Sequence, residues 1–566
     1  MKNKKVYTAD FETRNSDIDI SNNETSVWLY DICDIETFEH KTGTNLEDFM
    51  KDLEQIGRAT IYFHNMSGFD GNFILYYLLS NGYEYNEERK VKTHTFQTLT
   101  DDFCTIYNIK ICYDDGRETH KNQQVIEIRD SARKIQGSEE QIAKDFKLPV
   151  QKGLIEYKKY RPADYEPTAE EIEYIHHDTE IIARVLNMEY KMDMTHLTSA
   201  SDTFNLYKKW CGSGFNIMFP VLSIEIDDYI RQSYRGGVCQ VNEEYAGKEV
   251  YEPINVYDVN SMYPYQMCSQ ALPYSRPKKF KGKYKKDEVY PLYIQHIICR
   301  CELKKGMRPT VLEKGLIFSK PQYLVEALDD PIDLYLTNID LELFMKHYTI
   351  YDIEYIDGYK FKGSRKLFKG FIMPIYKRKA ESVGAERQLY KILLNSLYGK
   401  FATNPRRVNK VPYIDKELDR IAFRVTEEIK EKPIYTAVAS FITAYARKQL
   451  FDVIDNVDKA FIYCDTDSCH ILNDVLPPEY VDNKEIGKWK LEETFIHTKY
   501  IGQKAYMGET TEGIVITRCA GAPKDVRDLF DFENFNVGEE FDGKLLPKKV
   551  KGGVVLVDTK FTIKPR

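Results

Sequence analysis

Apolar runs that end in acidic residues recur along this chain. Near the N-terminus, a strand-like alternation of apolar and polar positions places Asp10 and Glu12 two residues apart. Because side chains in a strand alternate between its two faces, both carboxylates are expected on the same face. A later run, Ala460 to Tyr463, favours a strand and leads into Asp465 and Asp467. The hydrophobic pattern therefore predicts strands that present paired carboxylates.

Strand-favouring residues continue beyond Asp467, through Cys469, His470 and Ile471. A short acidic tip between two such runs predicts a β-hairpin, although no Asn-Gly turn marks it. Two carboxylates this close repel each other unless a cation lies between them, and a site rich in oxygen suits Mg²⁺. A solvated acidic turn is the plain alternative, which these residues alone do not exclude.

A third carboxylate follows another apolar run. Thr60 to Asn65 is typical of a strand that breaks at Met66 to Gly68 and resumes at Phe69 to Gly71, so that Asp70 lies in the resumed part. The apolar residues from Phe73 to Leu79 predict the start of a helix.

A helix with a clear start signal supplies the next carboxylate. Pro167 precedes Thr168, and Glu171 follows three residues later, which is the pattern of a capping box. Tyr174 and Asp178 lie four residues apart on this helix and share a face. Each acidic residue alone could be a surface charge. Together, the carboxylates suit a two-metal site for hydrolysing a phosphodiester, in which one cation activates water and the other stabilises the leaving oxygen.

The pattern changes character at about residue 199. Glu225 to Arg231 predicts a helix, which Tyr234-Arg-Gly-Gly237 joins to a strand. The two glycines allow the backbone to approach a ligand closely, although a plain turn would need them equally. Further on, a β-branched strand delivers Asp258 at its end, and Pro264 prevents the strand from continuing.

Glu386 to Lys400 predicts one helix with a polar stripe. The stripe residues follow one another at spacings of four, four and three, so they share a face, while three leucines lie elsewhere and can be buried. These stripe residues are Arg387, Lys391, Asn395 and Tyr398. Two cations, an amide and a ring suit a nucleoside triphosphate, which offers phosphates and a base. A solvated helix face is the alternative.

Length and charge set further limits. The chain has 566 residues, too many for one core, which predicts about three or four domains. The formal net charge of −8 argues weakly against a nucleic-acid partner, but carboxylates concentrated at metal sites can hide a basic channel. Basic residues cluster in Arg276 to Lys286, Arg365 to Lys379 and Lys544 to Arg566. Such runs are usually solvated faces, so they favour a nucleic-acid partner only modestly.

The cysteines and the N-terminus indicate a location. Eleven scattered cysteines without a CxxC pair predict reduced thiols, rather than a disulfide framework or a zinc site. The N-terminal residues lack the apolar segment of a signal peptide, and no apolar run approaches the length of a transmembrane helix. We therefore expect a soluble intracellular protein.

The N-terminal motifs resemble those of a known family. Asp10-Phe-Glu12, Asn65 to Asp70 and Tyr174 to Asp178 are similar to the three motifs of DEDD-type 3′–5′ proofreading exonucleases. In that family, Tyr174 would mark the subtype in which a tyrosine helps to orient the attacking water. Lys152 matches a lysine that assists the chemistry.

The rest of the chain resembles the family B DNA polymerases. Asp258 to Pro264, Leu394 to Lys400 and Tyr463 to Ser468 are similar to their motifs A, B and C, in the family's order. The resemblance is strongest to the protein-primed polymerases of small tailed phages. Lys391 to Gly399 fits the second motif of that group, and Lys504-Ala-Tyr506 fits its primer-terminus motif.

The resemblance implies a multidomain fold of α/β and α+β type. It comprises an RNase H-like exonuclease domain and a right-hand polymerase with palm, fingers and thumb. Two insertions, called terminal protein regions, are also expected: the first contacts the priming protein and DNA. The second is a hairpin, with strands at 410–414 and 420–425, that helps to enclose the template. The implied boundaries are 1–198 for the exonuclease, 199–269 and 436–525 for the palm, 270–367 and 404–435 for the insertions, 368–403 for the fingers and 526–566 for the thumb.

For polymerisation, the resemblance implies that Asp258 and Asp467 hold two Mg²⁺ ions, for which Mn²⁺ can substitute, with Asp465 in support. Val259 belongs to the same metal site. Tyr263 is expected under the sugar, where it leaves no room for a 2′-hydroxyl, and Tyr398 packs on the nascent base pair or is purely structural. The residues expected to contact the nucleotide are Val259, Tyr263, Lys379, Lys391, Asn395 and Tyr398.

For editing, the resemblance implies a second metal pair, held by Asp10, Glu12, Asp70 and Asp178. The residues expected to contact DNA are Thr13, Asn65, Phe69 and Ser131 in the exonuclease, and Tyr234, Gly236, Gly237, Thr443, Arg447, Lys504 and Tyr506 in the polymerase. Relatives usually have Ser-Leu where this chain has Ser131-Ala132, which puts the detailed grip on the frayed strand in doubt.

The function implied is a processive, strand-displacing and protein-primed DNA polymerase with proofreading, acting as a monomer on a linear phage-type genome in the host cytoplasm. Its partners would be template and primer DNA, dNTPs and a terminal protein, with no membrane contact. Three alternatives stay open: a family B polymerase that uses ordinary primers, a nuclease with a degenerate polymerase half, and a non-catalytic DNA-binding protein.

Overall fold

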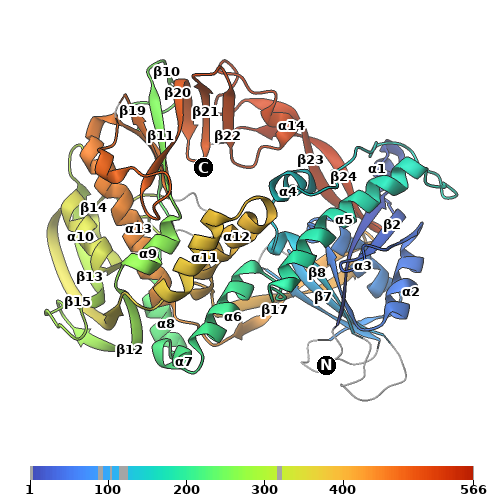
Figure 1. Ribbon diagram of the computed structural model, residues 1–566, viewed down its shortest axis with the longest axis horizontal. Helices are drawn as coiled ribbons and strands as arrows, with labels where there is room; N and C mark the ends of the chain where they lie inside the picture. Colours follow the sequence, from blue (N-terminus) through green and yellow to red (C-terminus); the bar gives the residue numbers. More distant parts are fainter. Residues whose placement is uncertain are drawn as a thin grey trace.

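The computed structural model describes residues 4–86, 94–101, 105–113, 125–314, 322–473 and 475–564. Within these ranges the strands form two eight-stranded sheets, one four-stranded sheet and two isolated hairpins. Figure 1 shows the N-terminal sheet at one end of the molecule and the other large sheets at the opposite end, with helices between them.

The N-terminal sheet is mixed and has the order β3-β2-β1-β4-β8-β7-β6-β5. β1 lies between β2, which runs antiparallel to it, and β4, which runs parallel. Its strands are β1 (Lys5–Thr13), β2 (Val27–Asp34), β3 (His40–Gly43), β4 (Ala59–Phe63), β5 (Glu84–Tyr85), β6 (Thr95–Thr100), β7 (Ile106–Cys112) and β8 (Val125–Asp130).

Helices cover both faces of this sheet. Tyr7, Ala9 and Phe11 of β1 pack in one core with α2 and α3, while Val6 lies in the core with α4 and α5. The period of two thus directs Asp10 and Glu12 toward α5, as expected. The helices of this part are α1 (Asp17–Asn22), α2 (Leu46–Ile56), α3 (Asp70–Ser80), α4 (Glu139–Phe146) and α5 (Ala169–Lys191), with a short 3-10 turn η1 (Ser131–Arg133).

Two local predictions for this part have opposite outcomes. The capping box at the start of α5 is confirmed, because Thr168 and Glu171 bond to each other's backbone. The predicted return to a strand at residues 69–71 is wrong, because α3 begins at Asp70. Gly71 permits this close turn: a Cβ there would lie 3.1 Å from the carbonyl oxygen of Met66.

The second large sheet is antiparallel and has the order β22-β21-β20-β11-β19-β18-β9, with β10 also paired to β20. The predicted hairpin is confirmed as β18 and β19. Helices α9 (Met262–Ser269) and α13 (Thr436–Val457) pack against it through a core that includes Tyr257, Leu450 and Phe461. The strands are β9 (Cys239–Val241), β10 (Glu249–Val250), β11 (Ile254–Val259), β18 (Phe461–Asp465), β19 (Ser468–Leu472), β20 (Trp489–Gly502), β21 (Ala505–Thr510) and β22 (Val515–Cys519).

A group of helices fills the middle of the molecule. Leu389, Leu393 and Leu397 of α12 are buried, as the spacing predicted, and the polar stripe lies elsewhere on the helix. The predicted helix at 225–231 is confirmed as α8. These helices are α6 (Ser199–Cys211), α7 (Gly214–Met218), α8 (Ile224–Arg231), α11 (Lys369–Glu381) and α12 (Gly384–Phe401).

The four-stranded sheet follows α9 in the chain. Its order is β12-β15-β13-β14, and its strands are 10 to 17 residues long. The elements are β12 (Leu272–Lys281), β13 (Leu292–Leu303), β14 (Glu326–Thr337), α10 (Asn338–His347) and β15 (Tyr348–Ser364).

Two hairpins reach the N-terminal part and close a ring (Figure 1). The hairpin of β16 (Arg406–Asp415) and β17 (Arg420–Lys430), predicted from the sequence, places Asp419 in a 2.9 Å hydrogen bond with the hydroxyl of Tyr76. The C-terminal hairpin of β23 (Glu540–Val550) and β24 (Gly553–Thr562) follows α14 (Lys524–Arg527). The amide of Thr25 donates to the carbonyl of Lys551 at 3.0 Å. The two hairpins also meet, with the ammonium of Lys549 4.4 Å from the ring centre of Phe423.

Two sequence expectations concern chemistry and membranes. The ten cysteines of the described ranges have free thiols, which agrees with the predicted reduced state. None of the helices described is long and apolar enough to cross a membrane.

Candidate active sites

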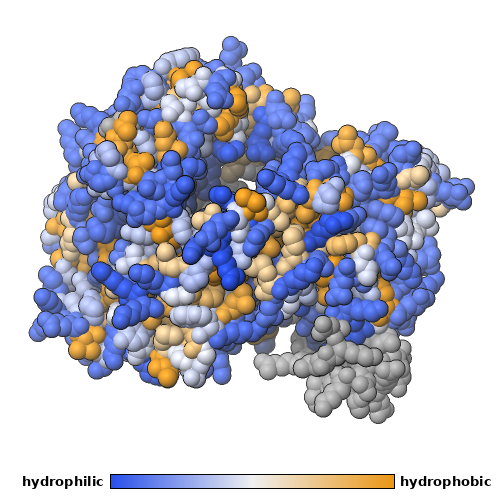
Figure 2. Space-filling model, viewed as in Figure 1, coloured by the Kyte–Doolittle hydropathy of each residue, from blue (hydrophilic) through white to orange (hydrophobic). Residues whose placement is uncertain are grey.

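The β18–β19 hairpin opens into a cavity of about 1060 Å³, here called the hairpin cavity. Figure 2 shows a hollow on the front face near its centre, above α11 and α12. Many of its lining residues were predicted from the sequence to contact nucleotide, metal or DNA, and they come from six different segments. They are Asp258, Val259, Tyr263, Lys379, Lys391, Asn395, Tyr398, Asp465, Asp467, Lys504 and Tyr506.

Asp258 and Asp467 meet because β11 pairs with β19. Asp258 lies opposite Ser468 in the register, and the amide of Val259 donates to the carbonyl oxygen of Asp467 at 2.9 Å. Burial, followed by the charge of Asp467, raises the pKa of Asp258 to about 7. Burial and the charge of Asp465 raise the pKa of Asp467 to about 6. Carboxylates held together at this cost suit a cation, which would relieve the repulsion.

Asp465 and Asp467 are not equivalent. Asp465 ends β18 and pairs with Ser468, so Asp467 lies in a two-residue turn. The prediction that a strand presents both carboxylates is therefore wrong for this pair. Thr466 has a positive φ of 60° in this turn. The ammonium of Lys504 lies 2.5 Å from a carboxylate oxygen of Asp465. Asp465 is therefore already neutralised by a protein cation, whereas Asp467 faces Asp258.

The two glycines after Tyr234 differ in their surroundings. A Cβ on Gly237 would lie 2.4 Å from the hydroxyl oxygen of Thr466, while Gly236 has open space at that position. The amide of Thr466 also donates to the carbonyl of Val238 at 2.7 Å. Because Gly237 has no side chain, the backbone of residues 237–238 can pack directly against Thr466 at the tip of the hairpin.

Cationic and aromatic side chains of α11, α12 and α9 face the carboxylates across the hairpin cavity. The ammonium of Lys379 donates to the hydroxyl of Ser261 at 3.0 Å. The charge of Lys391 acts to lower the pKa of Asp258, although burial outweighs it. The rings of Tyr263 and Tyr398 lie with their centres 4.1 Å apart. A cationic and an aromatic surface thus adjoin the carboxylate pair.

Thr443 and Arg447, expected to contact DNA, are buried in α13 with 1% and 3% of their surface exposed. The hydroxyl of Thr443 bonds to the backbone of its own helix. Arg447 donates to both carboxylate oxygens of Asp340 and to the carbonyls of Arg235 and Gly236. In this structure neither side chain is available to DNA, because helix packing directs them inward. Arg447 instead supports the segment that leads to Gly237.

Sequence analysis missed several charged residues that line the hairpin cavity: Lys490, Glu492, Arg518 and Arg527. Lys490 lies opposite Asp258 in the β11–β20 register. The charge of Glu492 raises the pKa of both Asp258 and Asp467. The only signal in the sequence is the spacing of two between Lys490 and Glu492, which is common on solvated faces.

The N-terminal carboxylates line a second cavity of about 650 Å³, here called the N-terminal cavity. Oxygen atoms of Asp10, Glu12 and Asp178 all lie within 4.8 Å of one another. Burial and the charge of Asp178 raise the pKa of Glu12 to about 8. Burial and the charge of Glu139 raise the pKa of Asp178 to about 7. The expected residues that line this cavity are Asp10, Glu12, Thr13, Asn65, Phe69, Asp70, Lys152, Tyr174 and Asp178.

The donor set of the N-terminal cavity fits Mg²⁺. One carboxylate oxygen of Asp70 and one of Asp178 are buried without a hydrogen-bond partner. Burial and the charge of Asp70 raise the pKa of Asp10 well above its usual range. Buried oxygens without partners and mutually repelling carboxylates are satisfied together by a hard cation.

Lys152 lies between two carboxylates, one of which the sequence did not reveal. Its ammonium lies 2.6 Å from Asp178 and also forms an ion pair with Glu139. Glu139 is in the first turn of α4, where an acidic residue is explained equally well by the helix dipole, so its spacing gave no functional signal. Glu139 nevertheless lines the N-terminal cavity.

Two further predicted residues have distinct surroundings. The hydroxyls of Tyr174 and Tyr157 lie 2.9 Å apart at the cavity wall. The side chain of Ser131 is fully buried and lies 2.9 Å from Nδ1 of His64, so its neighbour Ala132 lines the cavity instead. The turn η1 directs Ser131 inward, which leaves it no surface for DNA in this structure.

Comparisons with known proteins show the family to which this chain belongs. The family model for DNA polymerase type B, organellar and viral, matches residues 56–484. The DNA polymerase of Bacillus phage M2 is 40% identical, covering 99% of this chain and 100% of the relative. That of Bacillus phage phi29 is 40% identical and covers 99% of each chain, and that of Streptococcus phage Cp-1 is 33% identical over 99% and 98%.

Solved structures agree with the sequence comparison. A crystal form of phi29 DNA polymerase matches with a TM-score of 0.92 and 39% identity, covering 99% of this chain and 100% of the other. Its complex with primer-template DNA and incoming nucleotides matches with a TM-score of 0.91. The multidomain fold predicted from the sequence is therefore confirmed, and the chain belongs to the organellar and viral family of type B DNA polymerases.

Proposed function

We propose that the hairpin cavity is the site of template-directed DNA synthesis. The proposal rests on one observation: Asp258 and Asp467 line the same cavity as the cationic side chains of Lys379 and Lys391. Phosphoryl transfer depends mainly on positioning and on neutralising charge, which this arrangement supplies. The phi29 polymerase structure with primer-template DNA and nucleotides supports these ligands for this chain.

Each side of the hairpin cavity has a part in this reaction. Asp258 and Asp467, with Val259, would hold two Mg²⁺ ions. When bound, such ions lower the pKa of a primer 3′-hydroxyl and offset the charge of the triphosphate. Lys379 and Lys391 bind the phosphates, while the adjacent rings of Tyr263 and Tyr398 at the cavity wall contact the sugar and base. Lys504, paired with Asp465, orients the primer terminus.

The N-terminal cavity is proposed as the 3′–5′ exonuclease site. Asp10, Glu12, Asp70 and Asp178 would hold a second pair of Mg²⁺ ions, whose chemistry is the activation of water and the stabilisation of the leaving oxygen. Tyr174 positions the water, and Lys152 holds Asp178 in place. An unpaired primer end frays more readily than a paired one, so it reaches this cavity more often.

Processivity and strand displacement are proposed to follow from the ring. Contacts between the two hairpins and the N-terminal part surround the space between the cavities, and Pro547 and Leu556 of the C-terminal hairpin line the N-terminal cavity itself. A strand enclosed in this way cannot dissociate sideways. The four-stranded sheet β12–β15 is proposed as the region that receives a priming protein, and the phage origin of the relatives supports action in a host cytoplasm.

Extension of a primed single-stranded circle by the purified chain alone tests this function. Products longer than one circuit establish synthesis, displacement and processivity together, whereas failure to extend the primer with dNTPs and Mg²⁺ would refute the assignment. The matched variant Asp10→Ala with Glu12→Ala should lose degradation of single-stranded DNA and keep extension. Persistent degradation would place the nuclease site elsewhere.

Priming by a protein requires a separate test. Incubation with the cognate terminal protein, template and labelled dATP should attach label covalently to that protein. If label enters only nucleic-acid primers, the chain is a family B polymerase of the ordinary type, and the assignment of both cavities is unaffected.

A further inference from the structure

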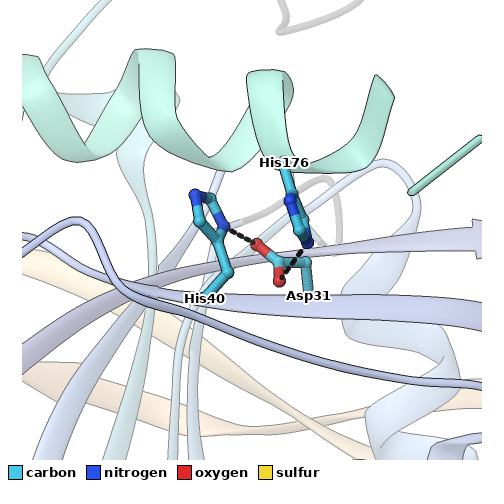
Figure 3. A group of neighbouring side chains, drawn as sticks. All are labelled: Asp31, His40 and His176. Atoms are coloured by element: carbon cyan, nitrogen blue, oxygen red, sulfur yellow. Dashed lines mark hydrogen bonds and ion pairs between the residues drawn. The ribbon is translucent and has the colours of Figure 1, made fainter. Parts of the chain in front are cut away.

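A buried carboxylate and two histidines meet on the side of the N-terminal sheet that α5 covers. Asp31 lies on β2, His40 opens β3 and His176 lies on α5. Figure 3 shows both imidazole rings beside the carboxylate, with one nitrogen of each ring near one of its oxygens. One donor atom from each of the three residues lies within 4.8 Å of the others.

This cluster is separate from the carboxylates of the N-terminal cavity. Asp31 is the cross-strand neighbour of Asp10, but its side chain is fully buried and none of the three residues lines that cavity. Its carboxylate accepts hydrogen bonds from the hydroxyls of Thr179 at 2.6 Å and Thr42 at 3.0 Å. The mechanism proposed above makes no use of these residues.

The full burial of the Asp31 carboxylate is the feature that needs an explanation. A fully buried carboxylate is costly unless a positive charge compensates it. In the part of the chain that the structure describes, its ion-pairing partners are His40 and His176, and neither lysine nor arginine pairs with it. An imidazole supplies such a charge only when it is protonated. A cation held by the same three side chains would supply the charge.

We propose that Asp31, His40 and His176 bind one divalent transition-metal ion of the zinc type. Two imidazoles and one carboxylate form a common ligand set for Zn²⁺, with water as the fourth ligand. Mg²⁺, in contrast, prefers oxygen ligands alone. The hydroxyls of Thr42 and Thr179 orient the carboxylate, as outer partners of metal ligands commonly do.

The distances show how little must move. Metal bonds of about 2.0–2.1 Å in a tetrahedral site place neighbouring donors about 3.3 Å apart. Nε2 of His176 already lies 3.5 Å from Asp31, and Nδ1 of His40 lies 2.7 Å from it. Nε2 of His176 also lies 2.8 Å from the hydroxyl of Thr42, a contact that the ion would replace. His40 therefore has to retreat by about 0.6 Å and turn out of its stack with His176, whose ring centre is 4.0 Å away. It is the first residue of an edge strand, where such a movement is cheapest.

The ion would join the edge of the sheet to α5. His176 lies two residues before Asp178 on this helix, so the bound ion fixes the helix that presents Asp178 and Tyr174 to the N-terminal cavity. Its role is structural, and it does not depend on which reaction that cavity performs.

Cobalt absorption tests the proposal with the full chain. The protein is stripped of metal and titrated with Co²⁺, whose tetrahedral complexes with imidazole absorb visible light far more strongly than its octahedral complexes with oxygen ligands. The expected result is a band that saturates at one equivalent, disappears on adding one equivalent of Zn²⁺, and is lost in His40→Gln and in His176→Gln. The control His177→Gln, whose side chain pairs with Glu173 on the outside of α5, should keep the band.

Three results would overturn the proposal: no band in the parent protein, a band that survives His40→Gln, or a band that disappears in Asp10→Ala with Glu12→Ala. The last would assign it to the N-terminal cavity. Thermal melting shows whether His40→Gln still folds: without metal, its melting temperature should lie within a few degrees of that of the parent. Zn²⁺ should then raise the melting temperature of the parent but not that of His40→Gln. Equal stabilisation of both proteins by Zn²⁺ would also contradict the site.

Discussion

Replacing Arg447 by alanine separates a structural role from a DNA contact. The guanidinium is 3% exposed, and its donors reach Asp340 at 2.8 to 2.9 Å and two backbone carbonyls at 2.7 Å. Removing it leaves Asp340 buried without its ion-pair partner, a loss that typically costs about 3–5 kcal/mol. An exposed ion pair contributes only about 0–1 kcal/mol. We therefore expect Arg447→Ala to lower the melting temperature markedly.

The same substitution should leave the salt dependence of DNA binding unchanged. Each phosphate contact adds about 0.9 to the slope of log binding constant against log salt concentration. Because Arg447 has no donor left for a phosphate, the slope measured with primer-template DNA between low and moderate salt should match that of the parent. Asp340→Asn should reproduce the instability, since it breaks the same pair. The neighbouring Lys448, whose side chain is 32% exposed, provides the control: Lys448→Ala should change stability by less than about 0.5 kcal/mol.

A different pattern would refute this reasoning. If Arg447→Ala melts with the parent and its salt slope falls by about 0.9, the side chain contacts phosphate in solution and the buried pair is not its main interaction. Parent-like melting of Asp340→Asn would contradict the pair in the same way.

Three further predictions concern the two cavities. Glu139→Gln should lower degradation of single-stranded DNA about 10-fold and leave primer extension unchanged, because it frees one side of Lys152; unchanged degradation would make Glu139 a simple helix-start charge. Gly237→Ala should lower primer extension about 100-fold without affecting degradation, because the added Cβ displaces Thr466 at the hairpin tip, and parent-like extension would show that the tip tolerates it. The third is that Mg²⁺ should raise the melting temperature more at pH 8 than at pH 6. Burial raises the pKa of Glu12 to about 8, so the folded state holds this proton more tightly than the unfolded state does. The metal-free protein therefore loses stability as pH rises from about 4.5 to 8, whereas Mg²⁺ binds the ionised carboxylate that forms over the same range. Melting curves with and without EDTA check the sign, and a larger effect of Mg²⁺ at pH 6 would contradict it.

The sequence was most informative where a local period decides the geometry. Asp10 and Glu12 share a face because of strand alternation, and Tyr174 and Asp178 share one because of helical spacing. The α12 stripe follows from the same rule. These patterns were readable because each depends on a few neighbouring residues.

Other features depend on contacts between distant segments, which no local pattern reveals. Arg447 is an arginine, a residue type that is mostly exposed in proteins, yet α10 covers it with Asp340. Asp467 lies in a turn whose conformation depends on the segment from Gly237 to Val238. Glu139 and Glu492 enter the cavities only because α4 and β20 pack beside the carboxylates. The long strands β14 and β15 give no clear strand pattern in the sequence, because charged residues interrupt their apolar positions.

The central claim is that one chain has two independent carboxylate sites, one for synthesis and one for degradation. Asp467→Asn tests it most directly, because this change removes one charge from the hairpin cavity and leaves the N-terminal cavity untouched. With Mg²⁺ and dNTPs, the variant should fail to extend a paired primer while degrading single-stranded DNA at the rate of the parent. Extension at the parent's rate would contradict the account.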